Sequence, residues 1–265
     1  MKKHIITTLF LAMSLAASAQ IIMEGSTTVL PLAQRTAEVF MNNNSKISIS
    51  VRGGGSGVGM NSLIAGTADI ANSSRAIKDG ELQKAAGKNI SPKATVAAMD
   101  AIALIVNPQN KISGLTKEQV KDIYVGKTKN WKEIGGNDAN IVAVSRDSSS
   151  GTFEAFNELA LEKTRVRKDA LMQASNRGVA GLVAATPGAI GYVGLGYLSN
   201  KTKTISVDGV MPSVQTVLQN KYLYSRPLFM YTNGEPKGEV KQYLDFVTGK
   251  QGQKIAQELG YVPLQ

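Results

Sequence analysis

Short apolar runs alternate with segments of helical periodicity along almost the whole chain, and this alternation restricts the possible folds more than any other feature. Residues 21–23 and 47–51 are strand-like runs, and each precedes a segment whose apolar residues recur at helical spacing. The run 101–107 is apolar almost throughout, as expected for a strand buried on both faces. Alternating strands and helices predict an α/β fold with mainly parallel sheets and flanking helices.

The expected strands and helices cover most of residues 21–259. We expect strands at residues 21–23, 47–51, 69–71, 94–99, 101–107, 141–145, 189–193, 204–207 and 227–231. We expect helices at residues 29–40, 60–65, 78–86, 179–185, 240–247 and 252–259, with two more beginning near residues 116 and 151. In sheets of this class, ligands bind at the carboxyl ends of strands, where helices begin.

Three segments rich in glycine, serine and threonine lie at strand ends that precede helices, at residues 24–31, 53–59 and 146–153. Backbone N–H groups at a helix start bind anions, and small hydroxyl side chains allow an anion to approach closely. Two segments lie before residue 60 and the third lies near residue 150, so a site shared between two lobes would explain their separation. Together they predict a buried oxyanion site.

The first two segments each allow two interpretations. Ser26, Thr27 and Thr28 either cap the first helix or contact the anion. The loop at residues 53–59 is not a nucleotide loop, because it lacks both the Walker lysine and the glycine spacing of a dinucleotide fingerprint. It is either a flexible turn or a loop whose backbone approaches an anion around Ser56.

Arg146 stands four residues before Ser150, Gly151 and Thr152 in the third segment. A guanidinium offers a planar fork of donors that matches two oxygens of a phosphate, and the three following residues add hydroxyl and N–H groups at a helix start. The alternative is a surface arginine near a capping serine. Because Arg146 directly follows an apolar strand, we expect its side chain to point into a cleft.

Arg75 is a second candidate guanidinium, directly after Ser73 and Ser74. It could contact the same anion, or it could pair with Asp69 or Asp100. Glu24, in the first segment, could orient an arginine or accept a proton.

The residue types that carry out most enzyme chemistry are missing after residue 4. His4 is the only histidine, and the chain has no cysteine. A Ser-His-Asp triad and a histidine-based metal cage are therefore excluded once the N-terminal segment is removed. No Asp and Glu cluster suggests a magnesium site. We predict a binding protein that is not an enzyme and that uses no cofactor or metal.

The first 19 residues have the layout of a secretory signal. Lys2, Lys3 and His4 give a basic start, residues 5–16 are apolar, and Ala17-Ser18-Ala19 is a small-residue cleavage site. We expect cleavage after Ala19 and export to a bacterial periplasm, the alternative being an uncleaved anchor. The net charge of +10 is dispersed without a basic run of five residues, so nucleic-acid binding is not expected.

The three segments, in this order after a signal peptide, resemble those of the periplasmic phosphate-binding proteins of high-affinity phosphate ABC transporters. Further similarity lies in Ile105–Pro108, Leu115–Val120, Ile123–Gly126, Asn130–Trp131, Gly135–Gly136 and Gly188–Tyr192. The resemblance covers essentially the whole mature chain. It is specific as a combination, although each loop alone is a weak signal.

The resemblance implies a two-lobed, type II periplasmic-binding-protein fold with hinge strands near residues 101–106 and 226–231. It assigns residues 20–100 together with 226–265 to lobe I, and residues 101–225 to lobe II. The phosphate ligands that it implies are Ser26, Thr27, Thr28, Ser56, Arg146, Ser150, Gly151 and Thr152.

One departure from the family concerns residues 73–75, where many relatives carry an aspartate that accepts the proton of hydrogenphosphate. This chain has Ser-Ser-Arg there. A site built to accept that proton rejects sulfate, because the acceptor would face an oxygen without a proton. Ser74 and Arg75 are expected to line the cleft instead. Asp147 either holds the Arg146 guanidinium in place or lies on the surface.

The implied function is high-affinity binding of inorganic phosphate and its delivery to inner-membrane ABC permease subunits with their ATPase. A monomer whose lobes close on the anion would perform it. The alternatives are a receptor for another tetrahedral oxyanion, such as sulfate or molybdate, and a less favoured phosphate-ester hydrolase. A basic surface protein is a further alternative, and its binding would fall steeply with salt.

Overall fold

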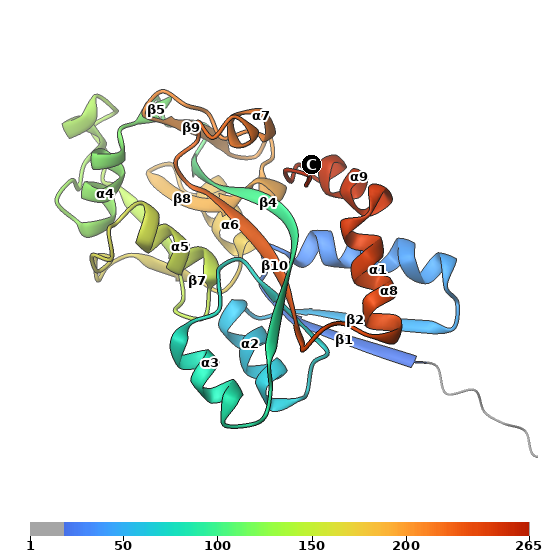
Figure 1. The fold of residues 1–265 in the computed structure, drawn as a ribbon. Helices are drawn as coiled ribbons and strands as arrows, with labels where there is room; N and C mark the ends of the chain where they lie inside the picture. Colours follow the sequence, from blue (N-terminus) through green and yellow to red (C-terminus); the bar gives the residue numbers. More distant parts are fainter. Residues whose placement is uncertain (1–18, 265) are drawn as a thin grey trace, which may run out of the picture.

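The computed structural model describes residues 19–264, which form strands and helices in near-regular alternation (Figure 1). The strands are β1 (Ala19–Gly25), β2 (Ile47–Gly53), β3 (Ile70–Ser73), β4 (Pro92–Val106), β5 (Gly114–Leu115), β6 (Val142–Arg146), β7 (Leu171–Gln173), β8 (Ala189–Gly194), β9 (Lys203–Val207) and β10 (Ser225–Asn233). The helices are α1 (Leu30–Asn43), α2 (Ser56–Ala65), α3 (Asp79–Ala86), α4 (Lys117–Val125), α5 (Gly151–Leu159), α6 (Asn176–Ala185), α7 (Val214–Leu218), α8 (Gly238–Thr248) and α9 (Lys250–Glu258). Each element expected from the sequence is present.

One expectation about the strands is wrong. Residues 94–99 and 101–107 do not form two strands, because β4 runs unbroken from Pro92 to Val106. Asp100 lies inside this strand and is paired in register with Arg226 of β10. The charged residue at position 100 looked like a break, but its side chain is compensated by the neighbouring strand.

The strands form one sheet with the order β2-β1-β3-β10-β4-β8-β6-β7, and β9 pairs with both β4 and β5. Parallel pairs occupy both ends of this order, as the α/β pattern predicted. The middle is antiparallel, because β10 pairs with β3 and β4, and β4 pairs with β8 and β9. The two long central strands therefore run in opposite directions between the two ends of the molecule.

Two hydrophobic cores lie on either side of this antiparallel centre. The first core draws its side chains from residues 21–98 and 228–261. The second draws from residues 101–224, together with Val262. We call the elements around the first core lobe I (β1–β3, α1–α3, α8 and α9) and those around the second lobe II (β5–β9 and α4–α7). β4 and β10 belong to both lobes.

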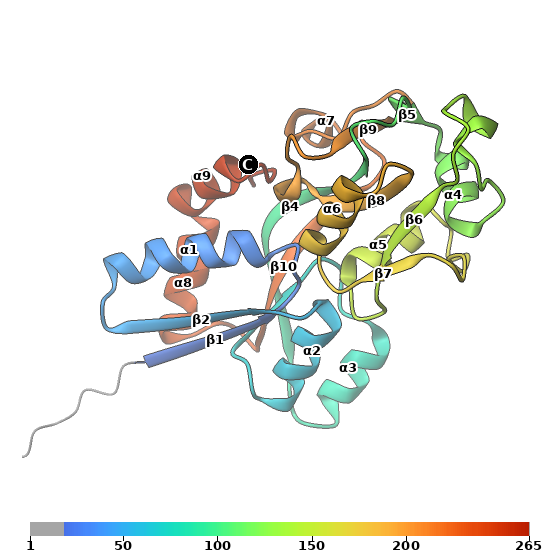
Figure 2. The same cartoon turned by 180° about the vertical axis from the view of Figure 1, so that it is seen from behind.

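This arrangement is a two-lobed fold with two connecting strands, which lie side by side through the middle of the molecule (Figures 1 and 2). In lobe I, α1, α8 and α9 gather on one side of β1 and β2, and α2 and α3 lie on the other. The predicted boundaries at residues 100/101 and 225/226 fall between the two cores, and they stay a prediction.

The helix starts that matter for the site differ in their caps. Ser150 caps α5, since its hydroxyl accepts a hydrogen bond from the Phe153 N–H at 3.2 Å. The predicted cap of the first helix is wrong, because Val29 occupies the cap position of α1 and makes no side-chain bond. The Ser26 hydroxyl instead accepts from the Thr28 N–H at 3.1 Å. The Ser26–Thr28 turn is thus held by its own hydrogen bond and by the Leu30 N–H at the start of α1, which donates to the Ser26 carbonyl at 3.1 Å.

Two further points concern the predicted signal segment and membrane-spanning helices. The predicted signal segment lies outside the described residues except for Ala19, which opens β1. Within residues 19–264, no helix has both the length and the apolar character needed to span a membrane.

Candidate oxyanion site

The three segments predicted to share a site come together between the lobes. The Gly57 N–H donates to the Ser149 carbonyl at 3.0 Å, and the Ser149 hydroxyl donates to the Gly54 carbonyl at 3.1 Å. The hydroxyls of Thr28 and Thr152 lie 2.7 Å apart although 124 residues separate them in the chain. The site is therefore assembled from both lobes, and the structure shows the lobes in contact.

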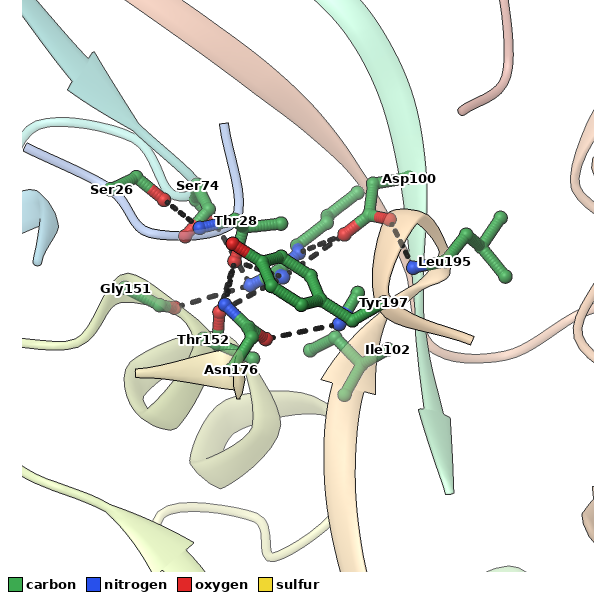
Figure 3. A network of polar contacts seen from close by, with 12 residues as sticks. Ser26, Thr28, Ser74, Asp100, Ile102, Gly151, Thr152, Asn176, Leu195 and Tyr197 are labelled. Carbon is green, nitrogen blue, oxygen red and sulfur yellow. Dashed lines mark hydrogen bonds and ion pairs between the residues drawn. The ribbon is translucent and has the colours of Figure 1, made fainter. Parts of the chain in front are cut away.

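The predicted hydroxyl residues of the site are buried. They come from the turn after β1, the start of α2, the end of β3 and the start of α5, and they are Ser26, Thr27, Thr28, Ser56, Ser74, Ser150 and Thr152. Buried hydroxyl groups need hydrogen-bond partners. Thr28 and Thr152 bond to each other across the lobes, Thr27 accepts from Arg146 and Asn176, and the serines bond within their own lobes. Figure 3 shows Thr28, Thr152 and Ser74 gathered around one centre.

Gly151 allows the closest approach of the two lobes. A Cβ atom placed there would overlap with the Ser56 hydroxyl oxygen and lie 2.8 Å from that of Ser74. Those two side chains are joined already, because the Ser56 Oγ accepts from the Ser74 N–H at 3.0 Å and lies 3.4 Å from the Ser74 Oγ. Glycine at position 151 is thus required for the lobes to meet this closely, and its role as a phosphate ligand stays a prediction.

Arg146 ends β6 and is buried, with 1% of its surface exposed. Its Nε donates to the Gln173 carbonyl at 2.9 Å, and its Nη2 donates to the Ala174 carbonyl at 3.0 Å and to the Thr27 Oγ1 at 3.2 Å. Within residues 19–264, its buried Nη1 has no hydrogen-bond partner. Burial lowers the pKa of Arg146, and the nearby Tyr192 and Asp147 oppose this effect only in part.

No salt bridge joins Arg146 to a carboxylate among the described residues, whereas Arg226 and Arg75 each have a carboxylate partner. Asp147 does not hold the guanidinium by a hydrogen bond, since its Oδ1 accepts from the Ser149 N–H at 2.9 Å and from the Ser149 hydroxyl. A buried cation that is fixed by carbonyl groups and keeps a free donor has the properties of an anion ligand.

Arg226 is the residue of the site that the sequence did not reveal. It is 5% exposed and lies on β10, where its Nε and Nη2 bind the Asp100 carboxylate at 3.2 and 3.0 Å. Its Nη1 donates to the carbonyls of Ser74 at 3.2 Å and Gly151 at 3.4 Å, and its Nη2 donates to the Thr152 Oγ1 at 3.1 Å. One guanidinium therefore binds loops from both lobes at the strand crossing.

Asn176 and Tyr197 complete the polar cluster from lobe II. The Asn176 Nδ2 donates to the Oγ1 atoms of Thr27 and Thr28 at 3.1 and 3.0 Å, and its Oδ1 accepts from the Gly194 N–H at 3.1 Å. The Tyr197 hydroxyl donates to the Thr27 carbonyl. A weak signal for Asn176 lay in the capping serine that precedes it, but the predicted helix began three residues too late.

The Arg75 guanidinium makes no hydrogen bond to the hydroxyl groups of the cluster, and its role as a phosphate ligand stays a prediction. Its Nη1 and Nη2 donate to the Glu81 carboxylate at 2.8 and 2.7 Å, and its Nε lies 2.7 Å from the Glu154 carboxylate. Neither Asp69 nor Asp100 is its partner. Two carboxylates already neutralise this guanidinium, which leaves it little capacity to hold a further anion.

The remaining predicted groups have structural partners. Glu24 accepts a hydrogen bond from the Ser62 hydroxyl on α2, and no ion pair joins it to an arginine within residues 19–264. No group of three or more carboxylate or histidine side chains that could hold a metal ion exists between residues 19 and 264. A cavity of ≈ 810 Å³ lies beside the cluster, and Ser74 and Arg226 form part of its lining together with Phe153.

Comparison with known proteins places the whole chain in a family. The sequence model of the PBP superfamily domain matches residues 12–251. The phosphate-binding protein PstS of Borreliella burgdorferi is 34% identical, and the match covers 100% of both chains. The phosphate-binding protein PstS of Bacillus subtilis is 36% identical over 94% of this chain and 82% of its own length.

Solved structures extend the similarity to three dimensions. A crystal structure with bound phosphate, described as a phosphate ABC transporter substrate-binding protein of Clostridium perfringens, superposes with a TM-score of 0.86 at 33% identity. The superposition covers 93% of this chain and 100% of that one. Sequence, fold and similarity therefore agree, and the chain belongs to the PBP superfamily and, within it, to the family of PstS-type phosphate-binding proteins.

Proposed function

We propose that this protein binds inorganic phosphate between its two lobes. The observation that carries the proposal is Arg146, a buried guanidinium with a free Nη1 and no carboxylate partner among the described residues. A dianion would supply the missing charge and the missing acceptor at once. The direct ligands that we propose are Ser26, Thr27, Ser56, Ser74, Arg146, Ser150, Gly151 and Thr152.

Thr28 and Arg75, which the resemblance or the sequence added to this set, take supporting roles in the proposal. The Thr28 hydroxyl bonds to Thr152 and so contributes indirectly. The Arg75 guanidinium pairs with Glu81 of lobe I and Glu154 of lobe II, and it favours the closed arrangement of the lobes. Both assignments follow from the partners that these side chains already have.

The cellular role that we propose is delivery of phosphate to an ABC import permease and its ATPase. The names of the similar proteins support this role, because they describe phosphate-binding and phosphate-transport receptors. The protein would act as a monomer in the periplasm after cleavage behind Ala19. Phosphate would stabilise the closed form, in which the lobes are joined through the anion, and the permease would recognise that form.

Binding without catalysis is part of the same proposal. Residues 19–264 contain neither histidine nor cysteine, and the serine hydroxyls of the cluster bond to backbone N–H groups or to other hydroxyls. No base is in place to activate one of them as a nucleophile. Incubation with phosphate esters should therefore release no phosphate, and a measurable turnover would contradict this part.

Calorimetric titration of the phosphate-stripped protein tests the proposed function. We expect one site with micromolar or tighter affinity, and sulfate serves as the competitor that separates a phosphate receptor from a general oxyanion receptor. Arg146→Ala should weaken binding at least about 100-fold, because two or more charge-assisted hydrogen bonds are lost.

Arg35→Ala is the matched control for that variant. Arg35 lies on the surface of α1 and pairs with Glu38, so its loss should leave the affinity for phosphate unchanged. An Arg146→Ala variant that binds phosphate as tightly as the parent would remove Arg146 from the site.

A further inference from the structure

The side-chain amide of Asn176 has only one possible orientation in the cluster. Its Oδ1 faces the Gly194 N–H at 3.1 Å, and a backbone N–H can only donate. Its Nδ2 must therefore be the atom that faces the hydroxyls of Thr27 and Thr28, at 3.1 and 3.0 Å. Asn176 is fully buried, so no water competes for these bonds.

The Thr27 hydroxyl consequently has no free lone pair. Its oxygen accepts from the Asn176 Nδ2 and also from the Arg146 Nη2 at 3.2 Å, and both of these groups can only donate. A hydroxyl oxygen offers two acceptor positions and one proton. With both positions occupied, the Thr27 proton is left for a further acceptor.

A second chain of hydrogen bonds directs the Thr152 hydroxyl in the same way. The Arg226 Nη2 has one hydrogen left beside its bond to Asp100, and the oxygens of Thr28 and Thr152 share this hydrogen at 3.4 and 3.1 Å. Because the Thr28 oxygen also accepts from the Asn176 Nδ2, its own proton is directed to the Thr152 oxygen, 2.7 Å away. The two lone pairs of Thr152 are then occupied, and its own proton is available only to a ligand. Figure 3 shows this chain of contacts from Asn176 through Thr28 to Thr152.

We propose that Asn176 and Arg226 are positioning residues that force the hydroxyls of Thr27 and Thr152 to donate into the oxyanion site. This inference rests on the proposed function and adds a rule for the ligand. The hydroxyls of the two threonines and the free Nη1 of Arg146 donate, so they bind only anion oxygens that carry no proton. These groups form the donor side of the site.

The Ser56 and Ser74 hydroxyls form a side of different character. Their oxygens lie 3.4 Å apart, either hydroxyl can donate, and the Ser56 oxygen has one lone pair taken by the Ser74 N–H at 3.0 Å. The Ser74 hydroxyl is free to turn and to accept. The proton of hydrogenphosphate is therefore received at Ser74, and the fixed donors of the other side keep the anion from binding in the reverse orientation.

Asn176→Asp tests the inference because it reverses the donor without changing the shape. The new carboxylate still accepts from Gly194, but its second oxygen obliges Thr27 and Thr28 to donate to it, so Thr27 turns a lone pair toward the anion. Hydrogenphosphate can donate to that lone pair, whereas sulfate has no proton to offer. Both are dianions at pH 8, so the added negative charge cancels in the ratio of their dissociation constants.

The dissociation constants of sulfate and phosphate are measured by calorimetry at pH 8 for the parent, Asn176→Asp and Asn176→Ala. We expect Asn176→Asp to raise the ratio of the sulfate to the phosphate constant by about tenfold or more over the parent. Asn176→Ala leaves Thr27 free to rotate, so both constants should rise while their ratio stays within about threefold. Equal ratios for all three proteins would overturn the inference, and a parent that binds neither anion would overturn the proposed function instead.

Neutron diffraction from deuterium-exchanged crystals of the parent with phosphate shows the direction of these hydroxyls without any variant. It needs no measurement of sulfate binding. The deuterons on Thr27 and Thr152 should point at phosphate oxygens, and the phosphate deuteron should point at Ser74. A deuteron directed from Thr27 to Asn176, or from Thr152 to Thr28, would disprove the assigned direction.

Discussion

At the scale of single residues, the protein treats two buried arginines of the cleft in opposite ways. Arg226 is neutralised by Asp100 at 3.0 Å, and its remaining hydrogens bind the loops. Arg146 receives only carbonyl and hydroxyl partners and keeps a free nitrogen. Burying a guanidinium without a counter-charge is unfavourable, so the protein places this cost where a ligand can remove it. Arg226 thus holds the loops of the site in place, and Arg146 keeps a donor for the ligand.

Asp100→Asn should therefore destabilise the protein strongly. Arg226 would keep its buried charge but lose its partner, a change that typically costs about 3–5 kcal/mol. Urea unfolding of the phosphate-free protein measures the effect. Asp245→Asn removes an exposed carboxylate from the exposed Lys241 and serves as the control, with an unchanged midpoint. Equal midpoints for both variants would show that the Asp100–Arg226 pair contributes nothing to stability.

Gly151→Ala should weaken the closed arrangement of the lobes without changing the stability of either lobe. The added methyl group would overlap with the Ser56 hydroxyl only when the lobes meet, and alanine suits the first turn of α5. Phosphate binding should weaken by about tenfold or more, while the thermal midpoint without phosphate should hold. Gly181→Ala, in an open position of α6, is the control and should leave the affinity unchanged. Full affinity in Gly151→Ala would show that the contact is not needed for binding.

At the scale of elements, α5 joins the lobes more than any other helix. Its first turn supplies Gly151 and Thr152 to the polar cluster, and the half-buried Glu154 follows. The Glu154 carboxylate lies 2.7 Å from the Arg75 Nε and 2.9 Å from the Lys78 Nζ, both of which belong to lobe I. The helix thus contacts the opposite lobe through the anion loops and through ion pairs beside them.

Glu154→Gln should weaken phosphate binding by about threefold to tenfold, because ion pairs that join the lobes favour the closed form. The unfolding midpoint of the phosphate-free protein should change little. Glu158→Gln, one turn further along α5, alters a carboxylate that pairs with Lys163 of the same lobe and should not affect affinity. Stopped-flow measurement should assign the effect to faster phosphate release. A change confined to the association rate would contradict this explanation.

At the scale of the whole molecule, β4 and β10 are the strands that pass from one core to the other. Two neighbouring strands allow a bending motion while they keep the lobes in register. Contacts between the lobes outside these strands are polar and centre on the loops, as in the bond between Gly57 and Ser149. A closure controlled by a small anion is consistent with such a polar and limited interface.

Small-angle X-ray scattering should detect this closure. The radius of gyration of the phosphate-stripped protein should decrease when phosphate is added, and the decrease should follow the same concentration dependence as calorimetric binding. Sodium chloride at matched ionic strength is the control. Identical scattering with and without phosphate would mean that the lobes do not move, and the proposed signal to a permease would need another basis.

The sequence predicted the parts of this molecule that depend on local patterns. The alternation of strands and helices, the Ser150 cap and the meeting of the Gly/Ser/Thr segments follow from neighbouring residues and from the known geometry of α/β folds. The partner of each arginine did not follow. Asp100 was available to Arg75, but it binds Arg226, which lies 126 residues away in the chain. Pairing over such a distance is set by strand register and packing, which local patterns do not encode.

The position of β10 has a consequence for how the protein is made. This strand lies between β3 and β4 in the sheet, yet a ribosome delivers it only after all of lobe II. Tyr261 and Val262, which bond to Thr28 and Met99, emerge later still. The first lobe to be started is thus the last to be finished, and until residue 225 emerges β3 waits with an open strand edge. Nascent chains must be kept from pairing at that edge. The need for chaperones is therefore greatest late in translation, and it rises with the rate of synthesis.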